Sequence, residues 1–370
     1  MAITRAFKNA VHQERRKTPI VVNGDMNVAQ RTTADVTGLG DGDEGYVNID
    51  RMRHTVTAGA GRYTCKQTND APTDSGFNFC LELDCTTADT SIAADEFMGI
   101  DYRVEGHDVQ HLKWGTSDAE YLTVGFWMKA DAAVAYSVGF INSDNSRHIR
   151  SLFTTGTDWT YHCIPFVGDT NSGPNDDVGE GLRLRFIFHG GSDTTGGTLG
   201  TSWESTTDAN QHVGGGSFFA STDRSIKMTG LQLERGYFTA ETMPPFQHES
   251  QHENLFRCER YCQVVGRDGD ASYQNIGVHG LGIGSTVVDT IQPLHPPMRT
   301  EPSMSSSGNL QASNGSSGFA ATAIAITSVS NSRQSAGIRL TVGSGISAGD
   351  SYRIEQANSS SAVVTIEAEL

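Results

Sequence analysis

The side chains in this sequence best suited to binding chemistry are aromatic. In YLTVGFWMK (121–129), strict alternation puts Leu122, Val124, Phe126 and Met128 on one face of a strand and Tyr121, Thr123 and Trp127 on the other. A sugar ring has an apolar face that stacks on Trp or Tyr, while polar neighbours bond its hydroxyls. If the first face is the core, Trp127 is presented to a groove or a partner chain. The candidate glycan-binding residues are Trp127, Tyr121, Trp159 and Trp203. The competing interpretation is that these rings complete a second hydrophobic layer, which is the commoner fate of tryptophan.

Acidic turns offer a second kind of chemistry. Asp41, Asp43 and Glu44 in DGDEG could supply the hard oxygen ligands that Ca²⁺ prefers, and Asp176 and Asp177 could add more. The sequence therefore raises a structural calcium as the one cofactor to consider. The alternative is that Asp-Gly simply marks a tight turn.

Other metal and catalytic patterns are weak. Zinc-binding atoms are carried by His248, His252, Cys258 and Cys262, but the spacing of these residues matches no known zinc finger. Side chains from a single helix also cannot easily complete the tetrahedral coordination of a zinc ion. The sequence has no G-x-S-x-G, no H-E-x-x-H and no P-loop. We expect no catalytic residues and no enzymatic activity.

Composition excludes several classes of partner. The net charge is −16, with 27 basic against 43 acidic residues, so a general phosphate-binding surface and nucleic-acid binding are not expected. No run of 18 apolar residues is present, and membrane insertion is not expected. The N-terminal segment lacks an apolar signal core, which favours assembly in a cytoplasm. The six cysteines are then expected to be buried thiols.

The secondary-structure elements expected to position these side chains are short strands. Gly (41 residues), Ser, Thr and Asn favour turns over helices, and about eleven period-two segments lie between turn clusters. The clearest is LRLRFIFH, where Leu182, Leu184, Phe186 and Phe188 share one face. VEGHDVQHLKWG is the one helix expected in that region. The double proline near Met243 marks a boundary. After it, HESQHENLFRCERYCQVV is expected to run from a helix into a strand, and the rest of the chain is expected to be β-rich with Ser/Gly-dense loops such as SSSGNLQASNGSSG (305–318). We predict an all-β protein with a short N-terminal arm (1–18), a jelly-roll β-sandwich (19–247) and a smaller C-terminal β domain (248–370).

Six segments, in order, resemble a family of bacteriophage tail-fibre and virion structural proteins. They are NGDMNVAQR, YRVEGHDVQHLKWGTSDAEYLTVGFWMKA, WTYHCIPF, MTGLQLERGYFTAETMPPFQHESQHENLFRCERYCQ, PPMRTEP and TIEAEL. Two positions depart from the family pattern: Cys262 stands in place of a Tyr, and Gly125 in place of a Ser. The resemblance implies a carbohydrate-binding-module-like jelly roll, a smaller β domain, a homotrimer and no catalysis.

From the residues and this resemblance together, we expect a tail fibre or related appendage subunit. It would be assembled in the host cytoplasm and located in the virion, where it would attach to host-surface glycan. The N-terminal arm would dock onto other virion proteins. Two alternatives stay open: a capsid decoration or head-fibre protein, and, from another class, a polysaccharide-degrading tailspike enzyme. Against the enzyme, no repeat of 20–30 residues is found.

Overall fold

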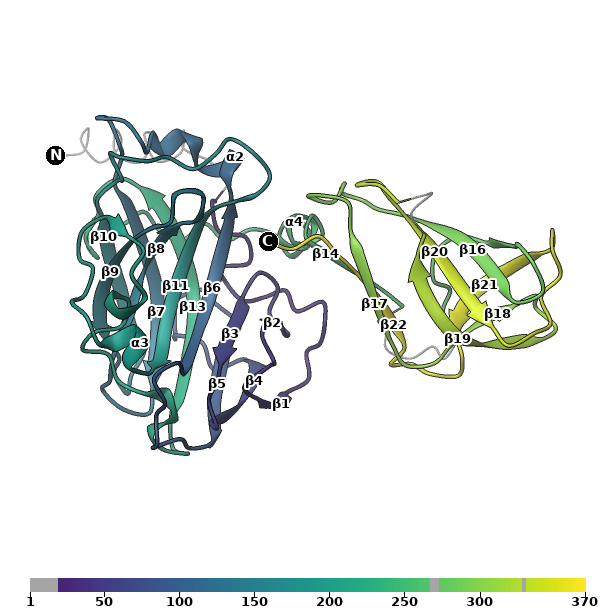
Figure 1. The fold of residues 1–370 in the computed structure, drawn as a ribbon, viewed down its shortest axis with the longest axis horizontal. Coiled ribbons are helices and arrows are strands. Elements are labelled where there is room, and N and C mark those ends of the chain that lie inside the picture. The colour runs from purple at the N-terminus through teal and green to yellow at the C-terminus, as the bar shows by residue number, and fades with distance from the viewer. Residues whose placement is uncertain (1–18, 267–272, 328–330) are drawn as a thin grey trace.

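The chain folds into two β-rich bodies that lie end to end (Figure 1). The computed structural model describes residues 19–266, 273–327 and 331–370, so the expected N-terminal arm (1–18) lies outside the described residues. The bodies have separate hydrophobic cores, one reaching from Val21 to Leu233 and the other from Ile276 to Ala368. Among the described residues, every helix is too short or too polar to reach across a bilayer.

The first body is a sandwich of two antiparallel sheets. The first sheet has six strands in the order β1 (Val36–Leu39), β4 (Arg62–Thr68), β5 (Cys80–Thr87), β13 (Ser225–Arg235), β7 (Leu122–Ala130) and β10 (Thr160–Phe166). The second has seven strands in the order β12 (Glu204–Ser205), β9 (Arg147–Thr154), β8 (Ala135–Asn142), β11 (Glu180–Gly190), β6 (Phe97–Glu105), β3 (Arg53–Thr57) and β2 (Gly45–Tyr46). The predicted all-β class with an N-terminal sandwich is confirmed.

Strand β11 shows how alternation builds this core. Leu182, Leu184, Phe186 and Phe188 are at most 1% exposed, as the sequence pattern predicts. The opposite face is not simply solvated, because Arg185 binds the fully buried Asp101 with two hydrogen bonds of 2.7 and 2.8 Å.

Short helical turns join the strands. The expected helix over VEGHDVQHLKWG is only α2 (Gly106–Val109) followed by the 3₁₀ turn η1 (Gln110–Leu112). It ends at Lys113, whose left-handed φ of 57° stops the turn. The remaining helical turns in this body are α3 (Ser192–Thr195), η2 (Ser143–Asn145), η3 (Asp208–Asn210) and η4 (Phe218–Ala220).

The second body is a closed six-stranded barrel beside a three-stranded sheet. The barrel strands in order are β15 (Gly280–Gly282), β16 (Val287–Pro293), β20 (Ser335–Val342), β19 (Gly318–Ile326), β18 (Leu310–Ser313) and β21 (Ser351–Gln356), and the sheet has β14 (Cys262–Val265), β22 (Val363–Glu367) and β17 (Ser303–Ser307).

The prediction that the Ser/Gly-rich stretch 305–318 forms loops is wrong. It contains the end of β17, all of β18 and the start of β19. Small polar residues tolerate a strand whose outer side faces solvent, and Gly308, at a φ of +72°, makes the turn between β17 and β18.

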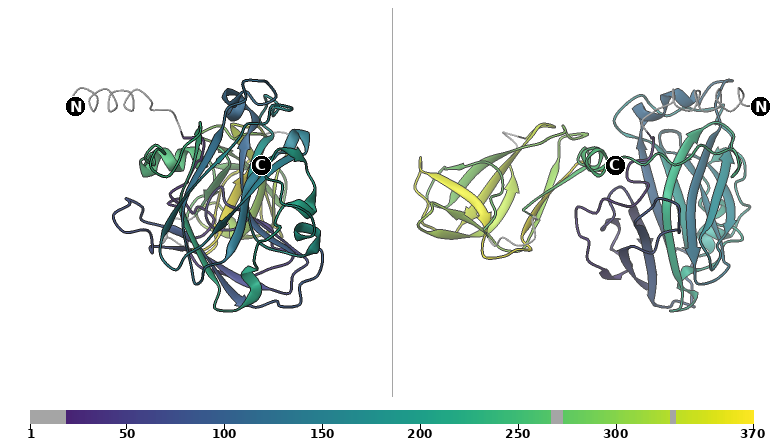
Figure 2. Two further views of the ribbon diagram at one scale, coloured as in Figure 1. Left: turned by 90° about the vertical axis from the view of Figure 1, so that its left-hand side faces the viewer. Right: turned by 180° about the vertical axis from the view of Figure 1, so that it is seen from behind.

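Helix α4 (Gln251–Cys258) lies between the bodies (Figures 1 and 2). It begins with a capping box, in which Ser250 and Glu253 each bond the other's backbone N–H. The helix follows the expected domain boundary near residue 247, yet Cys258 is buried with Val22 and Val28 of the first body. The helix therefore fastens the second body to the first. All six cysteines are free thiols, five buried and Cys163 half-buried, as expected.

Candidate functional site

The outer face of the first sheet carries an aromatic pair. Phe126 and Met128 point into the core and are fully buried, so the alternation of β7 turns Trp127 outward. Trp127 is paired with Tyr161 of β10, and their ring centroids lie 5.3 Å apart at 46°. Both residues are half-buried.

A bulge in the neighbouring strand makes room for Trp127. The register between β13 and β7 shifts between Thr229 and Gln232, and Gly230 within this bulge has a φ of +64°. A Cβ on Gly230 would stand 2.6 Å from the Phe77 ring and 3.1 Å from the Trp127 ring. Gly230 thus lets Phe77 and Trp127 lie over the same strand, which sequence reasoning missed although the glycine within TGLQLE was visible.

Charged side chains lie next to the aromatic pair. Lys129, two residues along β7, pairs with Lys227 of β13, and both ammonium groups bind Asp70, at 3.2 and 2.6 Å. The hydrogen bond from Lys227 is the main reason that the pKa of the Asp70 carboxyl lies below its usual value. Lys227 also lies 3.4 Å from Glu82, so the two ammonium groups are balanced by two carboxylates.

An open pocket of about 280 Å³ lies at this end of the sheet. It is lined by Lys129, Ala130, Asp131, Thr157, Ser225 and Lys227. Asp131 is itself held by Arg224 at 2.5 Å. The pocket offers ammonium, hydroxyl and carboxylate groups, which are the donors and acceptors that a polyhydroxylated ligand needs.

The structure divides the predicted aromatic residues among three places. Trp159 directly precedes β10, one residue from the Thr160–Met128 pair, and so lies at the same end of the sheet as Trp127. Trp159 is half-buried, and its enclosed Nε1 has no hydrogen-bond partner among the described residues. Tyr121 lies at the other end of β7, six residues from Trp127.

Trp203 does not join Trp127. It immediately precedes β12, the edge strand of the second sheet, and packs on Trp114 with centroids 5.0 Å apart. Its Nε1 donates to the Val167 carbonyl at 2.6 Å. The alternative interpretation, a ring that completes the hydrophobic layer, describes Trp203 well, because it packs against the sandwich core.

A connecting segment separates the two ends of the outer face. Thr123 donates to the Gly236 carbonyl at 2.6 Å, and Gln232 donates to the Pro244 carbonyl at 3.1 Å. Between these points Met243 covers Gly125, where a Cβ would stand 3.0 Å from the methionine methyl. The segment from Gly236 to Pro244 therefore lies across the middle of β7, and the aromatic pair is confined to one side of it.

The predicted calcium ligands already have partners. Asp41 accepts from Ala58 N at 2.8 Å, Asp43 accepts from Gly40 N at 3.0 Å, and Glu44 binds Arg53 at 2.8 Å. In the described ranges no group of three or more His, Cys, Asp or Glu side chains is placed to hold a metal ion. Calcium stays a prediction from the sequence.

One buried set of side chains has the residue types of a hydrolytic triad. His189 Nδ1 lies 2.7 Å from Ser217 Oγ, and its Nε2 lies 3.0 Å from Glu96. The His189 ring is fully enclosed, packs edge-on against Phe219, and burial lowers its pKa. We assign it a structural role, since it fastens the turn η4 to β11.

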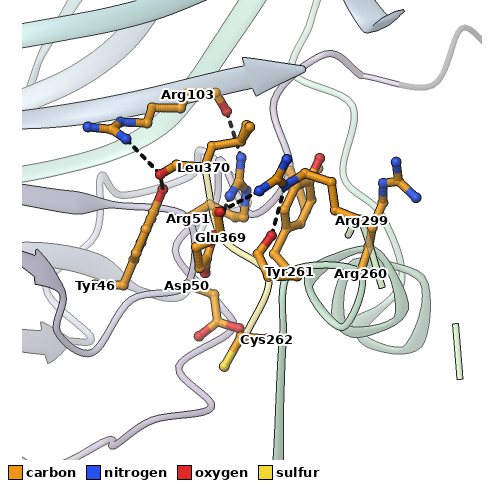
Figure 3. A network of polar contacts seen from close by, with 12 residues as sticks. Tyr46, Asp50, Arg51, Arg103, Arg260, Tyr261, Cys262, Arg299, Glu369 and Leu370 are labelled. Carbon is orange, nitrogen blue, oxygen red and sulfur yellow. Dashed lines mark hydrogen bonds and ion pairs between the residues drawn. The ribbon is translucent and has the colours of Figure 1, made fainter. Parts of the chain in front are cut away.

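A network of polar contacts lies where the bodies meet (Figure 3). Residues that follow β22 run onto the first body, where Arg103 and Tyr46 donate to the Leu370 carbonyl oxygen at 2.7 and 3.2 Å. Glu369 accepts from the buried Arg51 at 2.5 Å. The last residues of the chain are thus held by side chains more than 250 positions earlier in the sequence.

Three further arginines complete the network. Arg299 donates to the carbonyls of Ala368 and Glu369 at 2.8 and 2.7 Å. Arg31 binds Glu367 at 2.7 Å and Glu369 at 3.1 Å. Arg260 holds the buried Glu105 at 2.6 Å. These charged hydrogen bonds hold the junction together.

Comparison with known proteins adds similarities of fold. No protein-family model matches the chain, and none of the curated proteins is similar in sequence. Among solved structures, a CBM4 structure is 8% identical. The match covers 58% of this chain and 97% of the CBM4 chain, with a TM-score of 0.29. A family 11 carbohydrate-binding module of a Clostridium thermocellum cellulosomal cellulase is 11% identical. The match covers 56% of this chain and 99% of the module, with a TM-score of 0.28. TmCBM61, solved with β-1,4-galactotriose, is 9% identical. The match covers 59% of this chain and 99% of TmCBM61, with a TM-score of 0.28. These TM-scores are low, so function has to be argued from the site's own residues.

Proposed function

We propose that this chain is a non-enzymatic glycan-binding protein that uses the outer face of the first sheet. One observation carries the proposal: the Trp127–Tyr161 pair lies beside an open pocket lined by Lys129, Lys227 and Asp131. The rings offer an apolar surface to a sugar, and the pocket offers directional hydrogen bonds to its hydroxyls.

The balance of charge favours an uncharged glycan. Lys129 and Lys227 share Asp70, and Lys227 also lies 3.4 Å from Glu82, so two ammonium groups face two carboxylates. An acidic sugar would have to compete with these carboxylates for the ammonium groups. A neutral hydroxyl can instead accept from a lysine and donate to a carboxylate at the same time.

Trp127→Ala tests the site. Against the best neutral oligosaccharide from a glycan array, calorimetry should show affinity reduced about tenfold, the loss expected for one stacking partner. Phe256→Ala is the matched control, because Phe256 is an exposed aromatic on α4 that belongs neither to the aromatic pair nor to the lining of the pocket. Both variants should melt near the wild-type temperature. Unchanged affinity in Trp127→Ala would refute the site.

We propose further that the chain is a bacteriophage appendage subunit, most simply of a tail fibre. The six segments that resemble the tail-fibre and virion family support this assignment. Immunogold labelling of particles should place the protein on the tail, and labelling of the head would favour the capsid-decoration alternative. Release of reducing ends from host polysaccharide would refute the non-enzymatic assignment.

The same proposal includes assembly into a homotrimer. Exposed apolar side chains on the barrel support a contact between copies, since soluble chains rarely leave such groups together in water. They are Val278, Leu281, Ile283 and Ile291, on and beside β15 and β16. The charged pair Asp289–Arg339 next to them is neutral overall, so a second copy of this acidic chain would not be repelled there.

A further inference from the structure

Two exposed tyrosines face each other at the opposite end of β7 from the aromatic pair. Tyr121 is 39% and Tyr237 62% exposed, and their rings meet edge to face with centroids 5.5 Å apart at 82°. Neither tyrosine hydroxyl forms a hydrogen bond with another described residue. We call these two residues the tyrosine platform.

The backbone fixes the platform. Gly236 donates its N–H to the Tyr121 carbonyl at 2.7 Å, so the residue before Tyr237 is tied directly to Tyr121. Gly236 has a φ of +126°, a conformation that a residue with a side chain rarely adopts, and this turn directs the chain into Tyr237. The backbone is thus fixed, and the rings pack edge to face on each other, so part of the entropy cost of ordering them is met before a ligand binds.

More apolar surface adjoins the platform. Phe166 pairs with Leu122, so the next residue of the edge strand, Val167, lies beside Tyr121. Val167 is 41% exposed, and its carbonyl holds Trp203 in place. Three of the exposed large hydrophobic residues of the first body therefore gather at one place.

The platform and the aromatic pair lie on the same strand face. Tyr121 and Trp127 are six residues apart, which corresponds to about 20 Å along an extended strand. The segment from Gly236 to Pro244 crosses between them, so one sugar ring cannot touch both. Any ligand that uses both has to be an oligosaccharide that passes over this segment, or two branches of one glycan.

We propose that the tyrosine platform is a second sugar-binding site, which takes an uncharged pyranose ring of the same glycan as the aromatic pair. This inference rests on the proposed function. A sugar matches the platform better than a protein side chain does, because the rings supply a stacking surface and the free hydroxyls supply hydrogen bonds at its rim. Two weak sites on one rigid sheet make the second contact intramolecular, which raises the apparent affinity for long glycans.

The test uses native electrophoresis of the full chain in gels containing a neutral β-1,4-glucan, an α-1,6-glucan or a galactomannan. Calorimetry follows, with short and long oligosaccharides of the polymer that retards the protein. Tyr237→Ala and Tyr121→Ala should weaken binding of the long oligosaccharide at least fivefold and leave the short one within twofold. Trp127→Ala should weaken both, and Tyr273→Ala, an exposed tyrosine of the second body, should change neither.

Each result is decisive. Retardation by no polymer overturns the proposed function and this inference together. Retardation that Trp127→Ala abolishes but the two tyrosine variants leave unchanged overturns the inference alone. Loss of binding in the tyrosine variants with full binding in Trp127→Ala refutes the site at the aromatic pair and overturns the inference with it, because the platform would then bind alone. A change of oligomeric mass in Tyr237→Ala would mean that the platform contacts protein, which overturns the inference.

Discussion

Arg51 lies over the ring of Tyr261, with its guanidinium carbon 3.6 Å from the ring centroid. The arginine belongs to the first body and the tyrosine to the segment that leads into the second. The same guanidinium donates to Glu369 and to the Arg103 carbonyl, at 2.5 and 2.6 Å. One buried cation therefore joins three distant parts of the chain.

Arg51→Ala should destabilise the protein by about 3–5 kcal/mol, since removing one partner of a buried ion pair leaves the other uncompensated. Calorimetric melting would measure the loss. Arg53→Ala is the matched control, because its partner Glu44 is about half exposed and such pairs contribute about 0–1 kcal/mol. Equal losses in the two variants would contradict a central role for Arg51.

Phe186→Ala should cost about 3–5 kcal/mol through lost burial and a residual cavity. Arg185→Ala should cost a similar amount, because it strands the carboxylate of Asp101, which is fully buried. Alternation alone, which turns Arg185 away from the core, would instead predict a small effect. The double variant Arg185→Met/Asp101→Leu should recover most of the loss, and urea unfolding that shows no recovery would contradict the ion-pair explanation.

Stability should fall as the pH drops from about 6.5 to about 4, in part through His212. Burial lowers the pKa of His212 to about 4, and its ring is held by Ser137 and the Gly216 carbonyl. In this window the unfolded chain binds a proton that the folded chain does not, so up to about 3 kcal/mol is lost on acidification. His212→Gln removes the titration, and its urea midpoint should depend less steeply on pH. A variant with the wild-type slope would exclude His212 as the cause.

Light scattering should give close to three times the chain mass of 39.8 kDa. Leu281→Asp should shift the protein toward monomer, because a carboxylate in an apolar contact has no partner. Ile92→Asp, at an exposed apolar residue of the first body, should leave the mass unchanged. A wild-type monomer at micromolar concentration would refute the trimer.

The sequence predicts those parts of the fold in which one periodic signal decides the structure. The alternation of Leu182 to Phe188 and the helix-to-strand order around Cys258 both appear as expected. The strands in the Ser/Gly-rich stretch 305–318 could not be predicted, because their partners β21 and β22 lie far along the chain and pairing overrides weak local preference.

The candidate site was predictable only in part. Alternation is enough to turn Trp127 outward, but Tyr161, Gly230 and the pocket between Lys129 and Lys227 depend on strand register, which no local pattern encodes. The tyrosine platform depends on a single turn at Gly236. The arginine network around Glu369 joins residues more than 300 positions apart and has no local signal.

Strand β22 is the central strand of the three-stranded sheet next to the junction, between β14 and β17. It is synthesised about a hundred residues after its partner β14. On the ribosome, the sandwich has all its strands once Arg235 has emerged, and it can fold while the rest is still being synthesised. The junction has to wait for Glu367 and Glu369. Until then β14 and β17 are nascent strands with open edges. In this interval the chain is most exposed to misassembly with other nascent chains that are being translated from the same mRNA.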